Sequence, residues 1–214
     1  MKKIILLGDS IRMGYDKYVK DALSDVAEVY YPEENCKFAQ YLLRFVPDWM
    51  GSGKWPTDAD LVHWNAGLWD VLELYGEPPM TSEEQYAEMI RRIYRLLRRL
   101  FPKAKIIFAT STSVQEEKYR PEFKRHNETI RRYNDIAIEA LSESDCLTYD
   151  LFEYSLSLPD TCRSDSTHFN SPEGRRAMGN RVLSVICSEL EIEANEVNIE
   201  NFVPENYSDK NIGN

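Results

Sequence analysis

A doubly wound α/β/α sandwich around a five-stranded parallel sheet is the fold class that the sequence predicts, and three observations support it. Five short apolar runs recur along the chain, and segments with helical spacing of apolar residues separate them. The first run, Ile4 to Leu7, is unbroken, as in a strand that is buried on both faces. The right-handed crossover rule suits both common strand orders, of which we expect the flavodoxin-like order 2-1-3-4-5.

Each element rests on apolar periodicity and on the residues that bound it. The predicted strands span residues 4–7, 27–31, 61–64, 105–110 and 146–150. The predicted helices are a first one through Tyr15, Val19 and Leu23, then segments at about 38–47, 81–100 and 121–141, and a last one from residue 171. Residues 48–60 and 151–170 are expected to be irregular.

Particular residues predict where helices start and stop. Pro47 is expected to end the second helix, because proline lacks the N–H that helix interiors need. Thr81 with Glu84 has the spacing of a capping box ahead of the third helix. Ser171 followed by Pro172 is typical of a capping residue and the first helical position.

Length and charge limit the classes of function. The 214 residues suffice for one sizeable core, and we expect one domain over residues 1–190 with an acidic extension over 191–214. The net charge of −10 argues against nucleic acid and against anionic membrane surfaces, since both need a basic footprint. The arginines of the segment 81–100 are therefore interpreted as a solvated helix face rather than a nucleic-acid stripe.

Cysteines, histidines and the amino-terminal run indicate the cellular setting. The apolar run after Lys2 and Lys3 is too short for a signal peptide or a transmembrane helix, so a cytoplasmic protein is expected. The four cysteines have no CxxC spacing and read as free thiols. With three well-separated histidines, we expect no metal site, and nothing in the sequence requires a cofactor.

Three residues have the types that serine-type acyl transfer needs. Such a reaction requires a hydroxyl nucleophile, an imidazole to take its proton and a carboxylate to orient that imidazole. Ser10 follows the first strand, where the carboxyl edge of a parallel sheet binds ligands. Asp165 and His168 lie three residues apart before the last helix, so the carboxylate reaches Nδ1 and leaves Nε2 for Ser10. Taken singly, each residue is more often a helix cap or a turn residue.

Three sequence blocks together resemble those of the GDSL/SGNH hydrolase superfamily. The blocks are Gly8-Asp9-Ser10, Gly67-Leu68-Trp69-Asp70 and Asp165-Ser166-Thr167-His168. The resemblance covers about residues 3–190 and implies a three-layer α/β/α fold with metal-independent ester hydrolysis. It also implies that Ser10 is the nucleophile, His168 the base and Asp165 its orienting acid.

The sequence departs from the superfamily pattern at two oxyanion donors. Trp69 stands where the superfamily usually has an asparagine, and we expect Asn65 to supply that amide instead. The loop after the second strand lacks the usual glycine, so the backbone N–H of Asn35 or Cys36 is the expected donor there, beside that of Ser10. Loss of one such donor costs about 2.7–4 kcal/mol of transition-state stabilisation.

Neighbouring residues are candidates for substrate binding. Arg12 could hold an anionic group or face solvent, while Trp64, Trp69 and Phe169 could stack on a sugar or pack in the core. The predicted function is hydrolysis of a short acyl ester, acetyl above all, on a carbohydrate or similar small polar substrate. The alternatives are a lipase or thioesterase of the same superfamily, and a carbohydrate- or metabolite-binding protein without turnover.

Overall fold

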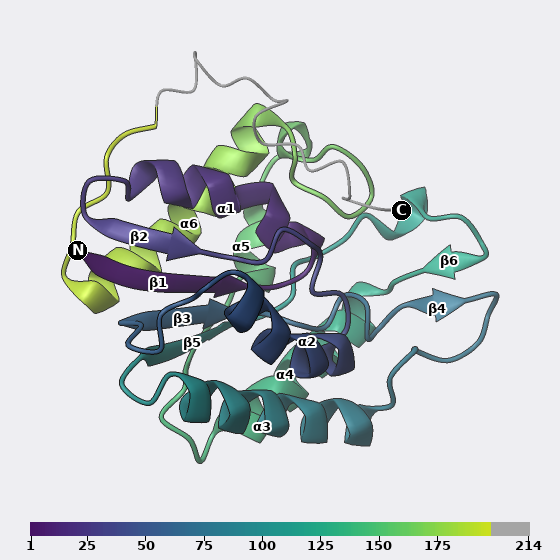
Figure 1. Ribbon diagram of the computed structural model, residues 1–214. Coiled ribbons are helices and arrows are strands. Elements are labelled where there is room, and N and C mark those ends of the chain that lie inside the picture. The colour runs from purple at the N-terminus through teal and green to yellow at the C-terminus, as the bar shows by residue number, and fades with distance from the viewer. Residues whose placement is uncertain (198–214) are drawn as a thin grey trace.

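The computed structural model describes residues 1–197, which form a three-layer α/β/α sandwich (Figure 1). The central parallel sheet consists of β1 (Lys2–Leu7), β2 (Ala27–Tyr30), β3 (Leu61–Trp64), β5 (Lys105–Ala109) and β7 (Leu147–Tyr149). Their order is β2-β1-β3-β5-β7, which is 2-1-3-4-5 when the parallel strands are counted along the chain. The predicted fold class and strand order are confirmed.

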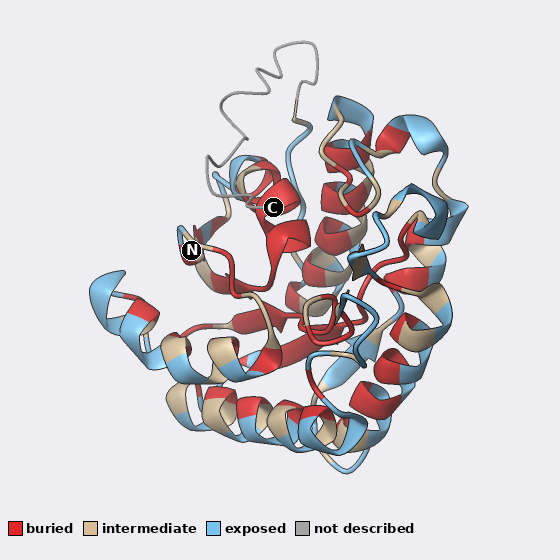
Figure 2. Ribbon diagram, turned by 90° about the vertical axis from the view of Figure 1, so that its right-hand side faces the viewer, coloured by how far each residue is buried: buried red, intermediate tan, exposed pale blue. Residues whose placement is uncertain are grey.

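Helices cover both faces of the sheet. One outer layer contains α1 (Ser10–Ala22) and α6 (Pro172–Leu190), and the other contains α2 (Ala39–Ser52), α3 (Glu83–Leu100) and α4 (Asn127–Leu141) (Figure 1). A short helix α5 (Phe152–Ser157) and two 3₁₀ turns, η1 (Glu116–Lys118) and η2 (Asp160–Cys162), lie in the connections. In Figure 2, the buried residues occupy the strands and the inward faces of the helices.

The register of the central strands brings two loops together. Ile4 pairs with Leu61 and Leu7 pairs with Trp64, so β1 and β3 end side by side. Residues 4–7 are fully buried, because both faces of β1 lie beneath helices. The turns that follow Leu7 and Trp64 therefore meet at the carboxyl edge of the sheet, where open α/β folds place their ligand sites.

Three predicted helix ends are wrong, two of them in α2 and α3. α2 continues through Pro47 to Ser52, because the residues beyond the proline gain burial: Trp49 is 7% exposed. Burial of so large a side chain offsets the roughly 3 kcal/mol that an interior proline costs. The capping residue of α3 is Ser82, whose hydroxyl accepts from the Gln85 N–H, rather than Thr81. The cap at Ser171 with Pro172 in the first turn is confirmed.

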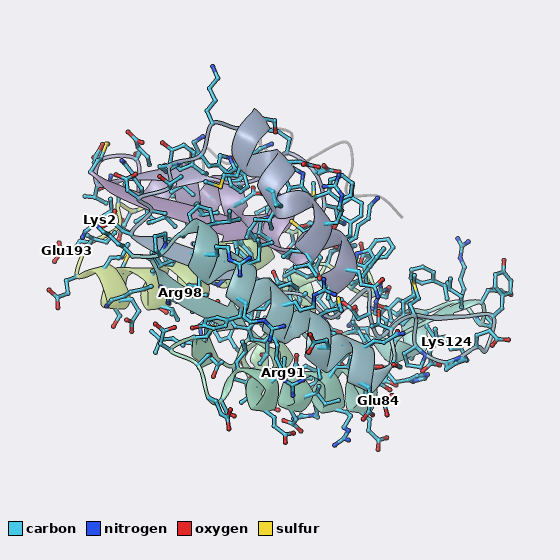
Figure 3. The ribbon with its side chains drawn as sticks, turned by 60° about the horizontal axis from the view of Figure 1, so that its bottom comes forward. Lys2, Glu84, Arg91, Arg98, Lys124 and Glu193 are labelled. Carbon is cyan, nitrogen blue, oxygen red and sulfur yellow. The ribbon has the colours of Figure 1, made fainter. Side chains whose placement is uncertain are left out.

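A small antiparallel ribbon lies outside the predicted elements. It pairs β4 (Glu73–Leu74) with β6 (Phe123–Lys124) and projects beyond the carboxyl ends of the sheet strands (Figure 1). Residues 121–126 were expected to begin a helix, yet α4 starts only at Asn127. Figure 3 shows Lys124 on this ribbon, away from the sandwich.

The arginines of α3 are exposed apart from the half-buried Arg98, and several pair with nearby acids. Figure 3 shows Arg91 and Arg98 along this helix. Arg95 lies 3.1 Å from Glu88, and Arg98 lies 2.9 Å from Asp145. This is the solvated face that the sequence predicts, and such exposed pairs contribute little to stability.

The predicted extension after residue 190 is described only in part. The Asn195 N–H donates to the Ala22 carbonyl at 2.7 Å, and its side-chain amide donates to Asp25. The beginning of the extension therefore contacts the end of α1, and residues 198–214 lie outside the described residues. No helix within residues 1–197 is long and apolar enough to cross a membrane.

Candidate active site

The turn after β1 places Ser10 at the amino terminus of α1. Asp9 is the capping residue, and its side chain accepts from the Ile11 N–H at 3.0 Å. Ser10 is the first helical residue and is 5% exposed. Its hydroxyl thus lies at the positive end of the helix dipole, where developing negative charge is stabilised.

The loop before α6 brings the imidazole of His168 to this hydroxyl. The distance from His168 Nε2 to Ser10 Oγ is 2.8 Å, and that from His168 Nδ1 to Asp165 Oδ2 is also 2.8 Å. Because the carboxylate accepts the Nδ1 proton, Nε2 is left to accept the serine proton. The structure therefore joins the three predicted residues in one hydrogen-bonded chain, although 158 positions separate Ser10 from His168.

Asp165 is held in its ionised form. Its Oδ1 accepts from the backbone N–H groups of Thr167 and His168 at 2.7 and 2.8 Å. Partial burial acts to raise the pKa of Asp165, but the hydrogen bond and charge of His168 and the two N–H donors outweigh burial and lower it. A carboxylate that stays charged keeps the imidazole oriented over a wide pH range.

Asn65 packs directly against Gly8. It follows β3, and its N–H donates to the Leu7 carbonyl at 3.2 Å. A Cβ at Gly8 would lie 1.9 Å from Asn65 Oδ1, so the absence of a side chain at position 8 makes room for this amide. Burial raises the pKa of Asp9, and the Ile11 N–H and the Asn65 side chain act against that shift.

The prediction that Cys36 supplies an oxyanion donor is wrong. Its backbone N–H donates to the Gly8 carbonyl at 3.1 Å, and its Sγ accepts from the Gly8 N–H at 3.4 Å. Both groups attach the loop after β2 to the serine turn and are not free for a ligand. The N–H of Lys37, which has the left-handed φ of 51° that favours glycine, donates to Asn35 Oδ1. The N–H of Asn35 forms no hydrogen bond within the described residues.

The expectation that Arg12 binds substrate or faces solvent is also wrong. The side chain is 0% exposed and is paired with Asp16, which is equally buried. It donates to the carbonyls of Pro32 and Glu34 at 2.9 and 2.6 Å. Arg12 is therefore a structural residue that holds the loop after β2 against α1. Arginine satisfies several buried acceptors at once, which explains why it occupies this position.

The three aromatic candidates divide between core and pocket. Trp64 is fully buried and packs edge-on against Phe108, with ring centroids 4.7 Å apart. Phe169 is 3% exposed, with the guanidinium of Arg163 4.3 Å from its ring. Both belong to the core, so their predicted contact with substrate is wrong. Trp69 alone of the three lines the pocket beside Ser10.

That pocket has a volume of about 580 Å³, within the range of small-molecule sites. One side is formed by Ser10, Leu68, Trp69 and the loop of residues 165–168. The other residues come from the segment 118–125 and were not identified from the sequence: they are Lys118, Tyr119, Arg120, Phe123 and Arg125. The only signal in the sequence is the density of basic and aromatic residues between Lys118 and Arg125.

The segment 118–125 and the residues just before it are hydrogen-bonded to the loop that carries Asp165 and His168. The Gln115 N–H donates to the Ser166 carbonyl at 2.8 Å, and the hydroxyl groups of Tyr119 and Thr167 are 2.6 Å apart. One wall of the pocket is thus attached to the loop of residues 165–168. Among the described residues, no cluster of three or more His, Cys, Asp or Glu side chains could hold a metal ion.

Asp70 connects the second block to the surrounding helices. It is fully buried and accepts from the Thr81 hydroxyl at 2.8 Å and the Ala39 N–H at 3.1 Å. Burial raises the pKa of Asp70 to about 7 against the effect of these donors. Its role is to fix the start of α2 and the residue before the α3 cap relative to the turn of residues 65–70.

Comparison with known proteins finds similarity in structure alone. No protein-family model matches the sequence, and no curated protein sequence matches it. A lipase/acylhydrolase from Enterococcus faecalis aligns over 92% of this chain and 100% of its own, with a TM-score of 0.67 and 19% identity. An acetyl xylan esterase aligns over 86% and 99%, with a TM-score of 0.64 and 18% identity.

A third solved structure, a carbohydrate esterase family 3 protein from Talaromyces cellulolyticus, aligns over 90% of this chain and 100% of its own, with a TM-score of 0.64 and 14% identity. At these identities the similarity concerns the fold. Further similar structures are described as GDSL-like lipases. The chain therefore has the fold of the GDSL/SGNH hydrolases.

Proposed function

We propose that the protein is a serine ester hydrolase that removes a short acyl group, acetyl above all, from a carbohydrate or similar polar substrate. The observation that carries the proposal is the hydrogen-bonded chain Ser10–His168–Asp165 beside a pocket of about 580 Å³. The activity is assigned to the domain of residues 1–190, with 191–214 as an extension. No metal or cofactor takes part in the steps below.

In the first half of the reaction, Ser10 Oγ attacks the ester carbonyl while His168 Nε2 takes the serine proton. The carbonyl oxygen becomes an oxyanion, for which the Ser10 N–H, the Asn65 side-chain amide and the Asn35 N–H are the proposed donors. His168 then gives its proton to the leaving alcohol, and the acyl group stays on Ser10. In the second half, His168 takes a proton from water while the water oxygen attacks the acyl carbonyl. His168 then returns the proton to Ser10 Oγ as the bond between Oγ and the acyl carbon breaks, and the acid leaves.

The chemistry of the pocket supports a small polar substrate. Its lining combines aromatic rings with charged side chains, and within residues 1–197 no long apolar helix lies over the pocket to shelter an acyl chain. Two of the structurally similar proteins are described as an acetyl xylan esterase and a carbohydrate esterase, which favours the same substrate class here. Others are described as lipases, so acyl length is a variable of the test.

The test is hydrolysis of p-nitrophenyl acetate, butyrate and octanoate by the wild type and by Ser10→Ala. We expect the acetate to give the highest kcat/KM, and Ser10→Ala to lower kcat by at least about 10⁴-fold, as removal of a triad serine does. The control is Ser184→Ala, which removes an exposed hydroxyl on α6 and should leave the rates unchanged. A fluorophosphonate should label the wild type at Ser10.

Activity that survives in Ser10→Ala would remove this residue from the mechanism. An optimum at eight carbons would favour a lipase or thioesterase. Failure of both hydrolysis and fluorophosphonate labelling, with retained binding of sugars, would favour a binding protein without turnover.

A further inference from the structure

The part of the pocket formed by the segment 118–125 is basic, although the chain as a whole is acidic. Three cations line this part: Lys118, Arg120 and Arg125. The carboxylate that lines the rest of the pocket, Asp165, is already hydrogen-bonded to His168. The net charge of the chain is −10. A concentration of positive charge in a concave site on an acidic protein attracts anions to that site.

Arg125 is the buried member of this group, with 4% of its surface exposed. Its Nε donates to the Leu68 carbonyl, and its Nη1 lies 3.5 Å from the Tyr119 hydroxyl, at the limit of a hydrogen bond. Its Nη2 donates to no described residue. This atom is not one of the unpartnered polar atoms that are fully enclosed by protein, and Arg125 lines the pocket, so a ligand in the pocket can reach Nη2. No carboxylate of the described residues forms an ion pair with Arg125, although the charge of Arg125 acts from a greater distance on the buried carboxylate of Asp9.

A buried guanidinium without a direct ion pair is costly, and the chain handles the buried Arg12 differently. Arg12 lies against the equally buried carboxylate of Asp16. Arg125 has instead the faces of Phe123 and Trp69, 5.0 and 5.9 Å from its central carbon. Aromatic faces stabilise a cation only in part, and a buried charge normally has an ionic partner.

We propose that this partner comes from the substrate: Arg125 binds a carboxylate or phosphate group of the ester, with Lys118 and Arg120 at the rim. The inference rests on the proposed ester hydrolysis and names its substrate class, an acylated acidic sugar or a comparable small anion. The planar fork of arginine suits both oxyanion groups. The pocket volume of about 580 Å³ holds a ligand of that size.

The kinetic test compares 4-acetoxybenzoate with its neutral methyl ester, two acetates that differ in one charge. In the wild type we expect kcat/KM to be at least about 10-fold higher for the anion. Arg125→Gln should bring this ratio close to one, and Arg125→Lys should keep part of it, since lysine retains the charge without the fork. The control Arg132→Gln removes an exposed cation of α4 that is paired with Glu83, and it should leave the ratio unchanged.

A binding test separates this inference from the proposed activity. Calorimetric titration of Ser10→Ala with glucuronate, glucose 6-phosphate and glucose needs no turnover. We expect both anions to bind at least about 10-fold more tightly than glucose, with a preference that falls as salt is added. Whichever of glucuronate and glucose 6-phosphate binds more tightly shows whether the site prefers a carboxylate or a phosphate group.

Each outcome decides a separate claim. Anion binding without hydrolysis of any ester would overturn the proposed function and leave the anion site intact. Hydrolysis with no preference for the charged acetate, or an equal preference in Arg125→Gln, would overturn the anion site and leave the esterase. If Arg125→Gln does not fold, the wild-type ratio and the titrations still decide, because equal binding of glucose and glucuronate contradicts the inference.

Discussion

Replacing Gly8 with alanine tests whether the serine turn and Asn65 form one close-packed unit. The new Cβ would lie 1.9 Å from Asn65 Oδ1 and 2.8 Å from the Arg12 Cβ, whereas non-bonded atoms pack at about 3.5–4.0 Å. Gly8 is not among the residues with left-handed φ, so the effect is purely steric. Because Arg12 is fixed by its buried bonds, the Asn65 side chain must move.

The size of the effect follows from this overlap. Overpacking of a close-packed site costs about 1–3 kcal/mol, and each kcal/mol lowers Tm by about 2–4 °C in a chain of this length. We therefore expect Gly8→Ala to unfold about 2–12 °C below the wild type. If Asn65 is an oxyanion donor, its displacement should also lower kcat for p-nitrophenyl acetate by about 10²–10³-fold.

A double-mutant cycle isolates the contact. Asn65→Ala alone should lower kcat by a similar factor, and the pair Gly8→Ala with Asn65→Ala should be no slower than either single variant. In urea unfolding, the double variant should be more stable than the sum of the single effects by more than about 0.5 kcal/mol. Additive stabilities, or a Gly8→Ala protein with wild-type Tm and kcat, would refute the reasoning.

Two further predictions concern buried charges. Because burial raises the pKa of Asp70 to about 7, the folded state binds more protons than the unfolded state between about pH 4 and 7. The free energy of unfolding should therefore fall by about 4 kcal/mol as pH rises through this interval. In urea titrations at pH 4.5, 6 and 8, Asp70→Asn should flatten this dependence on pH. An unchanged dependence in the variant would contradict the assignment to Asp70. Arg12→Met removes a buried ion pair with Asp16 and the donors to two backbone carbonyls, and it should cost about 3–5 kcal/mol. Arg44→Met removes an exposed pair of the same spacing and should cost under about 1 kcal/mol; equal losses would contradict the distinction.

The features that the sequence predicts well are those that depend on local chain geometry. The apolar run of residues 4–7 is typical of a buried strand, and the turn signal after it predicts Ser10 at a helix start, as the structure shows. The spacing of Asp165 and His168 suffices for the carboxylate to reach Nδ1, because one loop holds both. Their approach to Ser10 follows once the strand order is known. Ser10 begins α1, Asp165 and His168 precede α6, and these two helices pack together in one layer.

The features that the sequence does not predict depend on contacts between distant segments. Arg12 reads as a surface residue until its buried partners are known, although its spacing to Asp16 is that of a helical ion pair. Cys36 is a plausible oxyanion donor from the sequence, but in the structure its backbone N–H donates to the Gly8 carbonyl. The pocket wall around Arg125 was missed because it belongs to a two-residue ribbon strand and a turn, which leave no periodic pattern.

Residues 115–125 are attached to the loop that carries Asp165 and His168, and this attachment bears on how proteins of this fold can come to accept different substrates. The residues that would distinguish one ester from another sit on a single excursion between β5 and α4, outside the sheet and outside the main helices. Exchanging that excursion would change the lining of the pocket and leave Ser10, Asp165 and His168, the proposed catalytic residues, on other segments. The bonds from Gln115 and Tyr119 to Ser166 and Thr167 set the condition for such an exchange, because a replacement that loses them also releases the loop that aims the imidazole.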